Sequence, residues 1–405
     1  MSKPAFKSGW RRVKFGDVVR QVKTRVDPAT AGIARYVAGE HMDTDDLRIR
    51  RWGEVGDGYL GPAFHMRFRP GQVLYGSRRT YLRKVAVADF EGICANTTYV
   101  LETKDPSVLL PELLPFIMQT KGFNDHSVKQ SKGSVNPYIN FSDLEWYEFA
   151  LPPVEEQRRL AKLLMTVESV TTSLEEGQRK GQIAQDALLD RLMTAGTVPM
   201  QLDCTKTTHL GPVPKQWRVL PIQDALERII DYRGKTPEKA SSGIPLITAK
   251  NIRKGYIDPE PREYIAEETY NLRMTRGIPQ PGDVFLTTEA PLGMVARVPE
   301  YKFSPGQRIL TLRPKPDVLD SSYLFWLLMW SDSQRRIEQK SHGSTVVGIK
   351  QSVFREIPFR IPPFSEQQAI GRILDDMGSG VHEIHLRREK AIANRKLIIH
   401  GLVDS

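Results

Sequence analysis

Three short residue patterns are of the kind that catalytic or metal sites use. Asn136-Pro-Tyr138 is one proline short of the Asn-Pro-Pro-Tyr loop of amino-methyltransferases, and no glycine-rich cofactor loop accompanies it. Asp317 with Glu338-Gln-Lys340 has the carboxylates and lysine of some nucleases, but those enzymes place Glu-x-Lys on a strand, whereas residues 323–339 predict a helix. His382-Glu-Ile-His385 does not have the spacing of a zinc-binding histidine pair on a helix. The sequence therefore predicts no catalytic residue and no metal site.

Basic side chains point instead to a polyanionic partner. The formal net charge is +10 and the isoelectric point is near 9.4. Excess Lys and Arg favours nucleic acid because each neutralised phosphate releases condensed counterions. Arginine offers paired donors that suit phosphate or a guanine edge, and Asn251 could read adenine. The candidate DNA-binding residues are Arg48, Arg50, Arg78, Arg79, Tyr81, Arg83, Lys84, Lys132 and Ser134 in the first half, and Lys250, Asn251, Arg253, Arg273, Arg276, His342 and Ser344 in the second. Any one of them could equally belong to a solvated basic loop or a structural turn.

The chain contains a domain-sized internal repeat that must position these residues. Residues 131–153 recur at 341–363 without a gap, at an offset of 210 residues. Phe68-Arg-Pro-Gly-Gln-Val-Leu74 likewise parallels Pro279-Gln-Pro-Gly-Asp-Val-Phe285, where Pro-Gly predicts a turn before an apolar strand. A period this long indicates two similar domains, which could read two similar targets at a set distance. A duplication that drifted without a change of function stays open as the alternative.

Each half is predicted to be a mixed α and β domain followed by a long helix, so the fold class is α+β. Short β-branched runs divided by Gly and Pro dominate the first two thirds of each half. The expected organisation is a first domain at 1–150, a central helix at 151–196, a linker at 197–216, a second domain at 217–360 and a C-terminal helix at 361–405.

Both predicted helices carry a narrow apolar stripe at alternating spacings of three and four, which is typical of a helix seam. The seam residues are Leu160, Leu163, Val167, Val170 and Leu174 in the first helix, and Ile370, Ile373, Met377 and Ile384 in the second. At 1.5 Å a residue, each helix of some forty residues would be roughly 60 Å long. We expect the two to pack as an antiparallel coiled coil between the domains; the alternative is that each folds back on its own domain.

Other features of the sequence point to the cytoplasm. No apolar run approaches the roughly 20 residues of a membrane span, so no membrane contact is expected, and the first residues lack the apolar core of a signal peptide. Two cysteines, Cys94 and Cys204, are too few for a disulfide framework or a four-cysteine zinc site.

These motifs resemble the specificity subunit, HsdS, of Type I restriction-modification systems. The resemblance is carried by Leu151-Pro-Pro-Val-Glu-Glu-Gln-Arg-Arg-Leu160, Ile361-Pro-Pro-Phe-Ser-Glu-Gln-Gln-Ala-Ile370, Gly211-Pro-Val-Pro-Lys-Gln-Trp217 and the Phe68–Arg79 segment, and it covers essentially the whole chain. It implies two target-recognition domains that each read one half of a split, asymmetric DNA site, with two long helices setting the unread spacer. The patterned Gln and Arg residues that flank both seams suggest in addition that the helices dock the modification subunits.

The resemblance also implies partners that would carry the chemistry. Two modification subunits would use S-adenosylmethionine to methylate adenine in double-stranded DNA, and restriction subunits would use ATP and Mg to translocate and cut. No cofactor is expected on this chain, which lacks the complete Gly-x-x-x-x-Gly-Lys-Ser/Thr sequence of a phosphate-binding loop. The alternatives are a stand-alone DNA methyltransferase or nuclease, and an assembly scaffold that binds no DNA.

Overall fold

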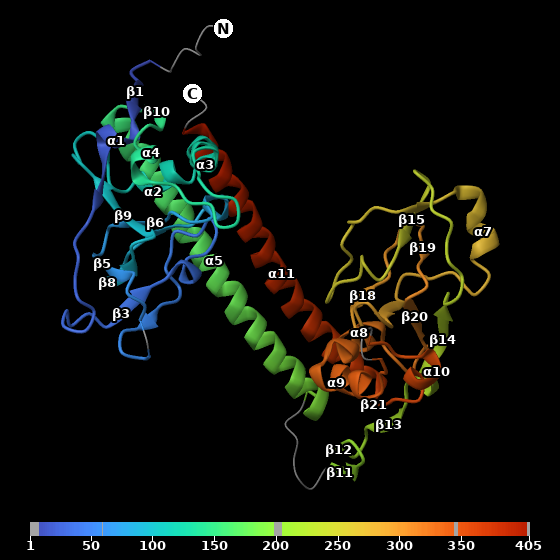
Figure 1. Ribbon diagram of the computed structural model, residues 1–405. Coiled ribbons are helices and arrows are strands. Elements are labelled where there is room, and N and C mark those ends of the chain that lie inside the picture. Colours follow the sequence, from blue (N-terminus) through green and yellow to red (C-terminus); the bar gives the residue numbers. More distant parts are fainter. Residues whose placement is uncertain (1–7, 59, 198–204, 344–346, 403–405) are drawn as a thin grey trace. The chain divides into compact units, whose positions relative to one another are not determined.

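The chain forms two compact units, each of which combines segments distant in sequence. The computed structural model describes residues 8–58, 60–197, 205–343 and 347–402 (Figure 1). The first unit consists of the residues up to Glu175 together with those from Leu386 onward, and the second unit is Glu176–His385. The boundaries therefore fall inside the two long helices, so each helix contributes to both units.

The first unit is built on two small sheets. One sheet is antiparallel, in the order β2-β9-β6-β7, and the other has the order β4-β3-β8-β5 with β3 parallel to β8. A further antiparallel pair joins β1 to β10, at the two ends of the domain sequence. The strands are β1 Arg11–Lys14, β2 Val19–Val22, β3 Arg35–Val37, β4 Gly53–Glu54, β5 Phe64–Phe68, β6 Val73–Gly76, β7 Val85–Val87, β8 Gly92–Ala95, β9 Thr98–Thr103 and β10 Glu148–Leu151, and the helices are α1 Phe15–Val18, α2 Leu114–Met118, α3 Lys121–Lys129 and α4 Phe141–Leu144, with 3-10 turns η1 Gly39–His41 and η2 Thr80–Leu82.

The second unit repeats this plan, which confirms the domain-sized duplication. Its main sheet has the order β14-β20-β17-β18, a smaller sheet has the order β16-β15-β19, and β13 pairs with β21 as β1 does with β10. The strands are β13 Arg218–Pro221, β14 Leu226–Asp231, β15 Ile244–Ile247, β16 Tyr264–Ile265, β17 Val284–Thr287, β18 Val295–Arg297, β19 Ser304–Pro305, β20 Ile309–Pro314 and β21 Pro358–Ile361, and the helices are α6 Ile222–Ala225, α7 Tyr270–Arg273, α8 Ser321–Met329, α9 Ser331–Gln339 and α10 Gln351–Phe354, with 3-10 turn η4 Glu267–Thr269.

Part of the expected linker is folded. In the 197–216 segment, β11 Thr205–Thr208 pairs antiparallel with β12 Gly211–Pro214. Gly211 has a φ of +84°, which residues other than glycine rarely adopt, and so allows the tight reversal between the two strands. Thr205–Thr208 supplies the β-branched residues that favour a strand, so Pro and Gly here mark a hairpin as well as a connection.

The two long helices, α5 Val154–Ala195 and α11 Phe364–Gly401, contact each other in an antiparallel sense within each unit (Figure 1). In the first unit the Arg395 Nε lies 2.7 Å from a carboxylate oxygen of Glu168. In the second unit Gln178 Nε2 lies 3.3 Å from His385 Nδ1, and a Cβ on Gly181 would lie 3.1 Å from Val381. Residue numbers that rise along α5 meet numbers that fall along α11, as the predicted antiparallel pairing requires.

The predicted seam residues differ in burial. Leu163, Val170 and Ile373 are 43%, 46% and 41% exposed. Ile370 is fully buried in the second core, and the others are partly buried: Leu160, Val167, Leu174, Met377 and Ile384. Ile384 faces α5, since a Cβ on Gly177 would lie 3.9 Å from it. Polar residues also take part in the helix contact, among them Glu168, Gln178 and Arg395.

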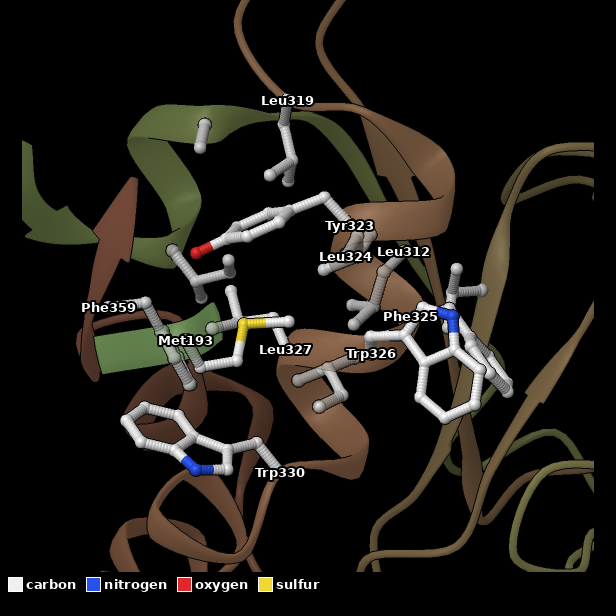
Figure 2. Close-up of a cluster of buried hydrophobic side chains, with 14 of the residues drawn as sticks. Met193, Leu312, Leu319, Tyr323, Leu324, Phe325, Trp326, Leu327, Trp330 and Phe359 are labelled. Carbon is white, nitrogen blue, oxygen red and sulfur yellow. The ribbon is translucent and has the colours of Figure 1, made fainter. Parts of the chain in front are cut away.

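Each hydrophobic core includes residues from both long helices. In the first unit Leu164 of α5, Ile399 of α11 and Leu402, which directly follows α11, join one buried cluster. In the second unit Leu374 of α11 and Leu189, Leu192 and Met193 of α5 join the corresponding cluster. Figure 2 shows Met193 of α5 among Phe359, Leu327 and Trp330. Burial of these side chains, at about 25 cal/mol for each Å² of apolar surface, fixes the helix ends to the sheets.

One glutamine joins the start of each long helix to its unit. Gln157 Nε2 donates to the carbonyls of Val108 and Pro152, both at 2.9 Å, and its Oε1 accepts from Leu110 N at 2.9 Å. Its counterpart Gln367 makes the same three bonds, to the carbonyls of Val318 and Pro362 and from Asp320 N, at 2.8 to 2.9 Å. Both side chains are buried. The repeated Pro-Pro-x-x-Glu-Gln sequence is therefore explained by a repeated hydrogen-bonded junction.

Candidate nucleic-acid interface

Two loops of the first unit lie together and carry exposed basic side chains. Residues 77–84 follow β6 and residues 131–139 follow α3; we call them the first loop pair. Arg79 N donates to Pro137 O at 2.6 Å, Ile139 N donates to Ser77 O at 3.0 Å, and Thr80 Oγ1 lies 2.9 Å from Ser131 Oγ. The duplicated Ser-x-Gly-Ser sequence is thus a structural turn that holds the preceding loop.

Arg78 and Arg79 are the predicted cations that remain available on this surface. Both are exposed, and neither guanidinium has a carboxylate partner within the described part of the chain. Arg78 lies over the ring of Tyr138, 5.8 Å from its centroid, which limits its rotamers without using its donors. A hollow of about 260 Å³ lies beside them, with Lys84 and Asn136 also in its lining. Two free guanidinium groups at the end of a sheet suit either phosphates or a guanine edge.

The other candidates in this loop pair contribute less. Tyr81 is 53% exposed, and Ser134 is exposed at the turn beside Val135. Lys132 is paired with Asp143 at 2.8 Å, and this hydrogen bond raises the pKa of the lysine and lowers that of the carboxyl. Lys84 donates to Gly39 O. Arg83 bonds to Asp45 at 2.7 Å and to Gln119 O at 2.9 Å, so its guanidinium joins two segments of the first unit.

Arg48 and Arg50 bind a carboxylate of the long helix instead of standing free. Their guanidinium groups lie 2.8 and 2.7 Å from Glu175 of α5, and both also bond to Asp46. Burial raises the pKa of Glu175, but the hydrogen bonds from Arg50 and Arg48 outweigh it and hold the pKa at about 2. These arginines join the loop at residues 46–50 to α5, and their predicted contact with DNA stays a prediction.

Asn251 cannot read a base, because all of its hydrogen-bonding capacity is used internally. It is 4% exposed, its Oδ1 accepts from Thr248 N and Oγ1, and its Nδ2 donates to Asp258 O and Pro261 O at 3.1 Å. Arg253 is also engaged, with Lys250 O at 2.6 Å and Asp258 at 3.0 Å. The Lys250 side chain is exposed. The Lys250–Lys254 segment is thus a tight turn built around a buried amide.

Arg273 and Arg276 are likewise held by carbonyl groups. Arg273 donates to Lys235 O and Pro305 O and to Ser304 Oγ at 2.6 to 2.8 Å, and its burial lowers the pKa of the guanidinium. Arg276 donates to Asp231 O and Arg233 O. Both were predicted as DNA-binding residues, and the structure gives them the role of joining segments of the second unit.

The second unit has a loop pair at the corresponding place, formed by residues 288–293 with 341–343 and 347–349. His342 is exposed and pairs through its backbone with Gly348, whereas Ser344 lies outside the described residues. Glu289 and Arg308, which form an ion pair at 3.0 Å, lie here and were missed from the sequence. Extending the Pro70-Gly-Gln-Val and Pro281-Gly-Asp-Val alignment forward would have matched Arg78 with Glu289.

The described residues offer no metal cluster of three or more His, Cys, Asp or Glu side chains. Asn136 and Pro137 belong to the first loop pair, and Glu338 lies on helix α9, as expected. In the part of the chain that the structure describes, no helix combines the length and apolar character that crossing a bilayer needs.

Two domains of the same fold, whose loop pairs carry different charges, define a protein with two recognition surfaces on a duplicated fold. The family described as "Type I restriction modification DNA specificity domain" matches residues 8–185 and 214–394, and the chain belongs to this family with two copies of the domain.

Known relatives agree with this assignment. The Type I restriction enzyme MjaVIII specificity subunit of Methanocaldococcus jannaschii is 22% identical over 321 residues, covering 77% of this chain and 73% of the relative. The crystal structure of a Type I restriction-modification system S subunit from M. genitalium has a TM-score of 0.65 at 14% identity, covering 98% of this chain and 96% of that one. A chain from a structural study of the assembly and conformational transition of the type I R-M system has a TM-score of 0.56 at 20% identity, covering 99% and 98%. The two structures establish the fold, and the family establishes a specificity subunit without catalytic activity of its own.

Proposed function

We propose that this chain is the DNA-binding subunit of a Type I restriction-modification complex, in which each unit reads one half of a bipartite, asymmetric site. The observation that carries the proposal is the repeat itself: the junctions around Gln157 and Gln367 match bond for bond, while the two loop pairs differ. Two half-site contacts on one chain make the second contact intramolecular, so modest half-site affinities combine into strong binding.

The long helices are proposed to set the unread spacer and to dock the modification subunits. The apolar residues left outside the helix contact support a docking role, since Leu163 and Val170 are nearly half exposed on α5. Val170 also lines a hollow of about 650 Å³ in the first unit, together with Leu110, Ala161 and Met165 among others. Apolar side chains flanked by polar ones are typical of a surface that another subunit covers.

Catalysis is assigned to partner subunits. We infer two modification subunits that use S-adenosylmethionine, and restriction subunits that use ATP and Mg. Their substrate is cellular double-stranded DNA, so the proposed location is the cytoplasm. The family assignment favours this role over a stand-alone methyltransferase, a nuclease or a scaffold that binds no DNA.

Selection from a random DNA library, with the chain assembled with its modification subunit, tests the proposal. The expected result is a split motif: two short conserved blocks separated by a spacer of fixed length and free sequence. Failure to enrich any motif would remove the proposed function, and methyl transfer or cleavage by the purified chain alone would support the enzyme alternatives.

A further inference from the structure

The two loop pairs superimpose in their backbone hydrogen bonds, which makes their side chains comparable position by position. Ser77 N donates to Thr97 O as Thr288 N donates to Arg308 O, both at 3.0 Å. Ile139 N donates to Ser77 O as Ile349 N donates to Thr288 O, at 3.0 and 2.9 Å. Lys132 pairs in both directions with Tyr138, as His342 does with Gly348.

These bonds match Arg78 with Glu289, Tyr138 with Gly348, and Thr97 with Arg308. The match is supported independently by two isolated bridges, Arg78 with Tyr138 and Glu289 with Gly348. The next residue has a φ of +50° in both units, at Arg79 and Ala290. A cation in one unit therefore stands where an anion stands in the other.

Each matched residue is supported by its own surroundings. The Arg78 guanidinium lies over the Tyr138 ring, whereas a Cβ on Gly348 would approach Glu289 Cβ to 3.1 Å and its Oε2 to 3.3 Å. Gly348 thus leaves the room that Glu289 occupies. Arg308 Nε holds Glu289 Oε1 at 3.0 Å, which orients the carboxylate, and about a third of the Glu289 side chain remains exposed.

The opposite charges suit opposite base edges. In the major groove guanine presents two acceptors, O6 and N7, which a guanidinium contacts with paired donors. A carboxylate accepts only, so it suits the exocyclic amino group of cytosine or adenine and is repelled by phosphate. A glutamate on a DNA-facing loop is therefore better explained by base contact than by backbone contact.

We propose that Arg78 and Glu289 are matched specificity-determining residues: Arg78 selects a guanine in one half-site, and Glu289 selects a base with an exocyclic amino group in the other. This inference rests on the proposed function. It explains how one duplicated frame reads an asymmetric site, because a single position carries a donor in one unit and an acceptor in the other.

The test compares Arg78→Lys and Glu289→Gln with the wild type, each assembled with the modification subunit, in the library selection described above. Arg78→Lys keeps the charge but loses the paired donors, so preference at one G·C pair of one half-site should fall about tenfold or more. Glu289→Gln should relax one position of the other half-site to a similar extent. Arg69→Lys and Glu300→Gln are matched controls, since Arg69 precedes β6 and Glu300 follows β18, away from the loop pairs, and their motifs should be unchanged.

Base analogues then identify the atoms involved. Replacing the selected guanine by 7-deazaguanine should weaken wild-type binding several-fold and leave Arg78→Lys almost unaffected. Replacing the base selected by Glu289 with an analogue that lacks the exocyclic amino group should likewise weaken binding of the wild type several-fold. Binding of Glu289→Gln should be almost unaffected by that analogue. Arg78→Ala and Glu289→Ala with unchanged thermal midpoints confirm that both side chains are dispensable for folding.

Three results would overturn the inference: unchanged motifs in both variants, an A·T pair at the position that Arg78→Lys relaxes, or uniformly weaker binding to all sequences with a smaller salt dependence, which indicates a phosphate contact. A wild type that enriches no split motif removes the proposed function, and the inference with it. A split motif that neither variant changes removes the inference alone.

Discussion

The Gln367 junction gives a quantitative prediction for the stability of the second unit. Gln367 is fully buried and makes three hydrogen bonds, two as donor and one as acceptor. Each contributes about 1 kcal/mol net, and truncation leaves the Asp320 N–H and two carbonyls without their partner. Gln367→Ala should therefore lower the free energy of unfolding by about 3 kcal/mol, roughly a hundredfold in the equilibrium constant.

Urea unfolding followed by tryptophan fluorescence is the suitable assay, because Trp217, Trp326 and Trp330 are all buried in the second unit. The two units need not unfold together, so the transition that these tryptophans report is the one to fit. Gln367→Met keeps the approximate volume without the amide, and it should lose nearly as much stability if the hydrogen bonds are responsible. Gln368→Ala, at the exposed neighbouring position, should change the stability by less than about 0.5 kcal/mol.

Unfolding of Gln367→Ala at the same urea concentration as Gln368→Ala would show that the three hydrogen bonds do not stabilise the second unit. A Gln367→Met variant as stable as the wild type would show that side-chain volume, and not hydrogen bonding, matters at this position. Gln157→Ala should act in the same way on the first unit, where Gln157 makes the equivalent bonds.

Four further predictions follow from the described contacts. Asn251→Ala should destabilise the second unit by about 2 to 4 kcal/mol in urea unfolding and leave the selected DNA motif unchanged; an altered motif would restore Asn251 as a base reader. Glu175→Gln should lower the free energy of unfolding of the first unit by about 1 kcal/mol at pH 7, measured by hydrogen exchange. Because the pKa of Glu175 in the folded protein, about 2, lies below the ordinary 4.5, this difference between wild type and variant should be constant above about pH 5. It should shrink as the pH falls through 4.5 towards 2. The double variant Leu163→Glu, Val170→Glu should keep the thermal midpoint of the wild type but abolish co-purification of the modification subunit. The control Ser173→Glu should still co-purify, and a double variant that co-purifies would exclude the Leu163 and Val170 face of α5 as the docking surface. Inserting one heptad after Glu175 and another after Arg387 should lengthen the spacer in the selected motif by about three base pairs, at 1.5 Å a residue and 3.4 Å a base pair, and an unchanged spacer would show that the helices do not set it.

The repeat could be predicted because the same short sequence motifs occur in both halves of the chain. The Pro-Pro motif before each long helix is followed by a buried glutamine, and both copies survive because both make the same bonds. The helices themselves were also predictable, since residues 154–195 contain no proline and repeat apolar residues at spacings of three and four.

The helix contact and the DNA-binding residues were harder to predict, because charge alone does not reveal a partner. Glu168 and Arg395 look like solvent-exposed residues in the sequence, yet they pair at 2.7 Å in the contact between α5 and α11. Arg48 and Arg83 look like phosphate ligands, but their carboxylate partners Glu175 and Asp45 lie 127 and 38 residues away. Only the tertiary structure distinguishes these arginines from Arg78.

The sharing of both long helices between the units has a consequence for the order of folding during synthesis. The core of the first unit contains Ile399 and Leu402, which are synthesised after the whole of the second unit. Domains usually fold from the N-terminus as they emerge, but here the core that includes Leu164 lacks these two side chains until the second unit has been made. The first unit can therefore complete its core only after the second unit has been synthesised.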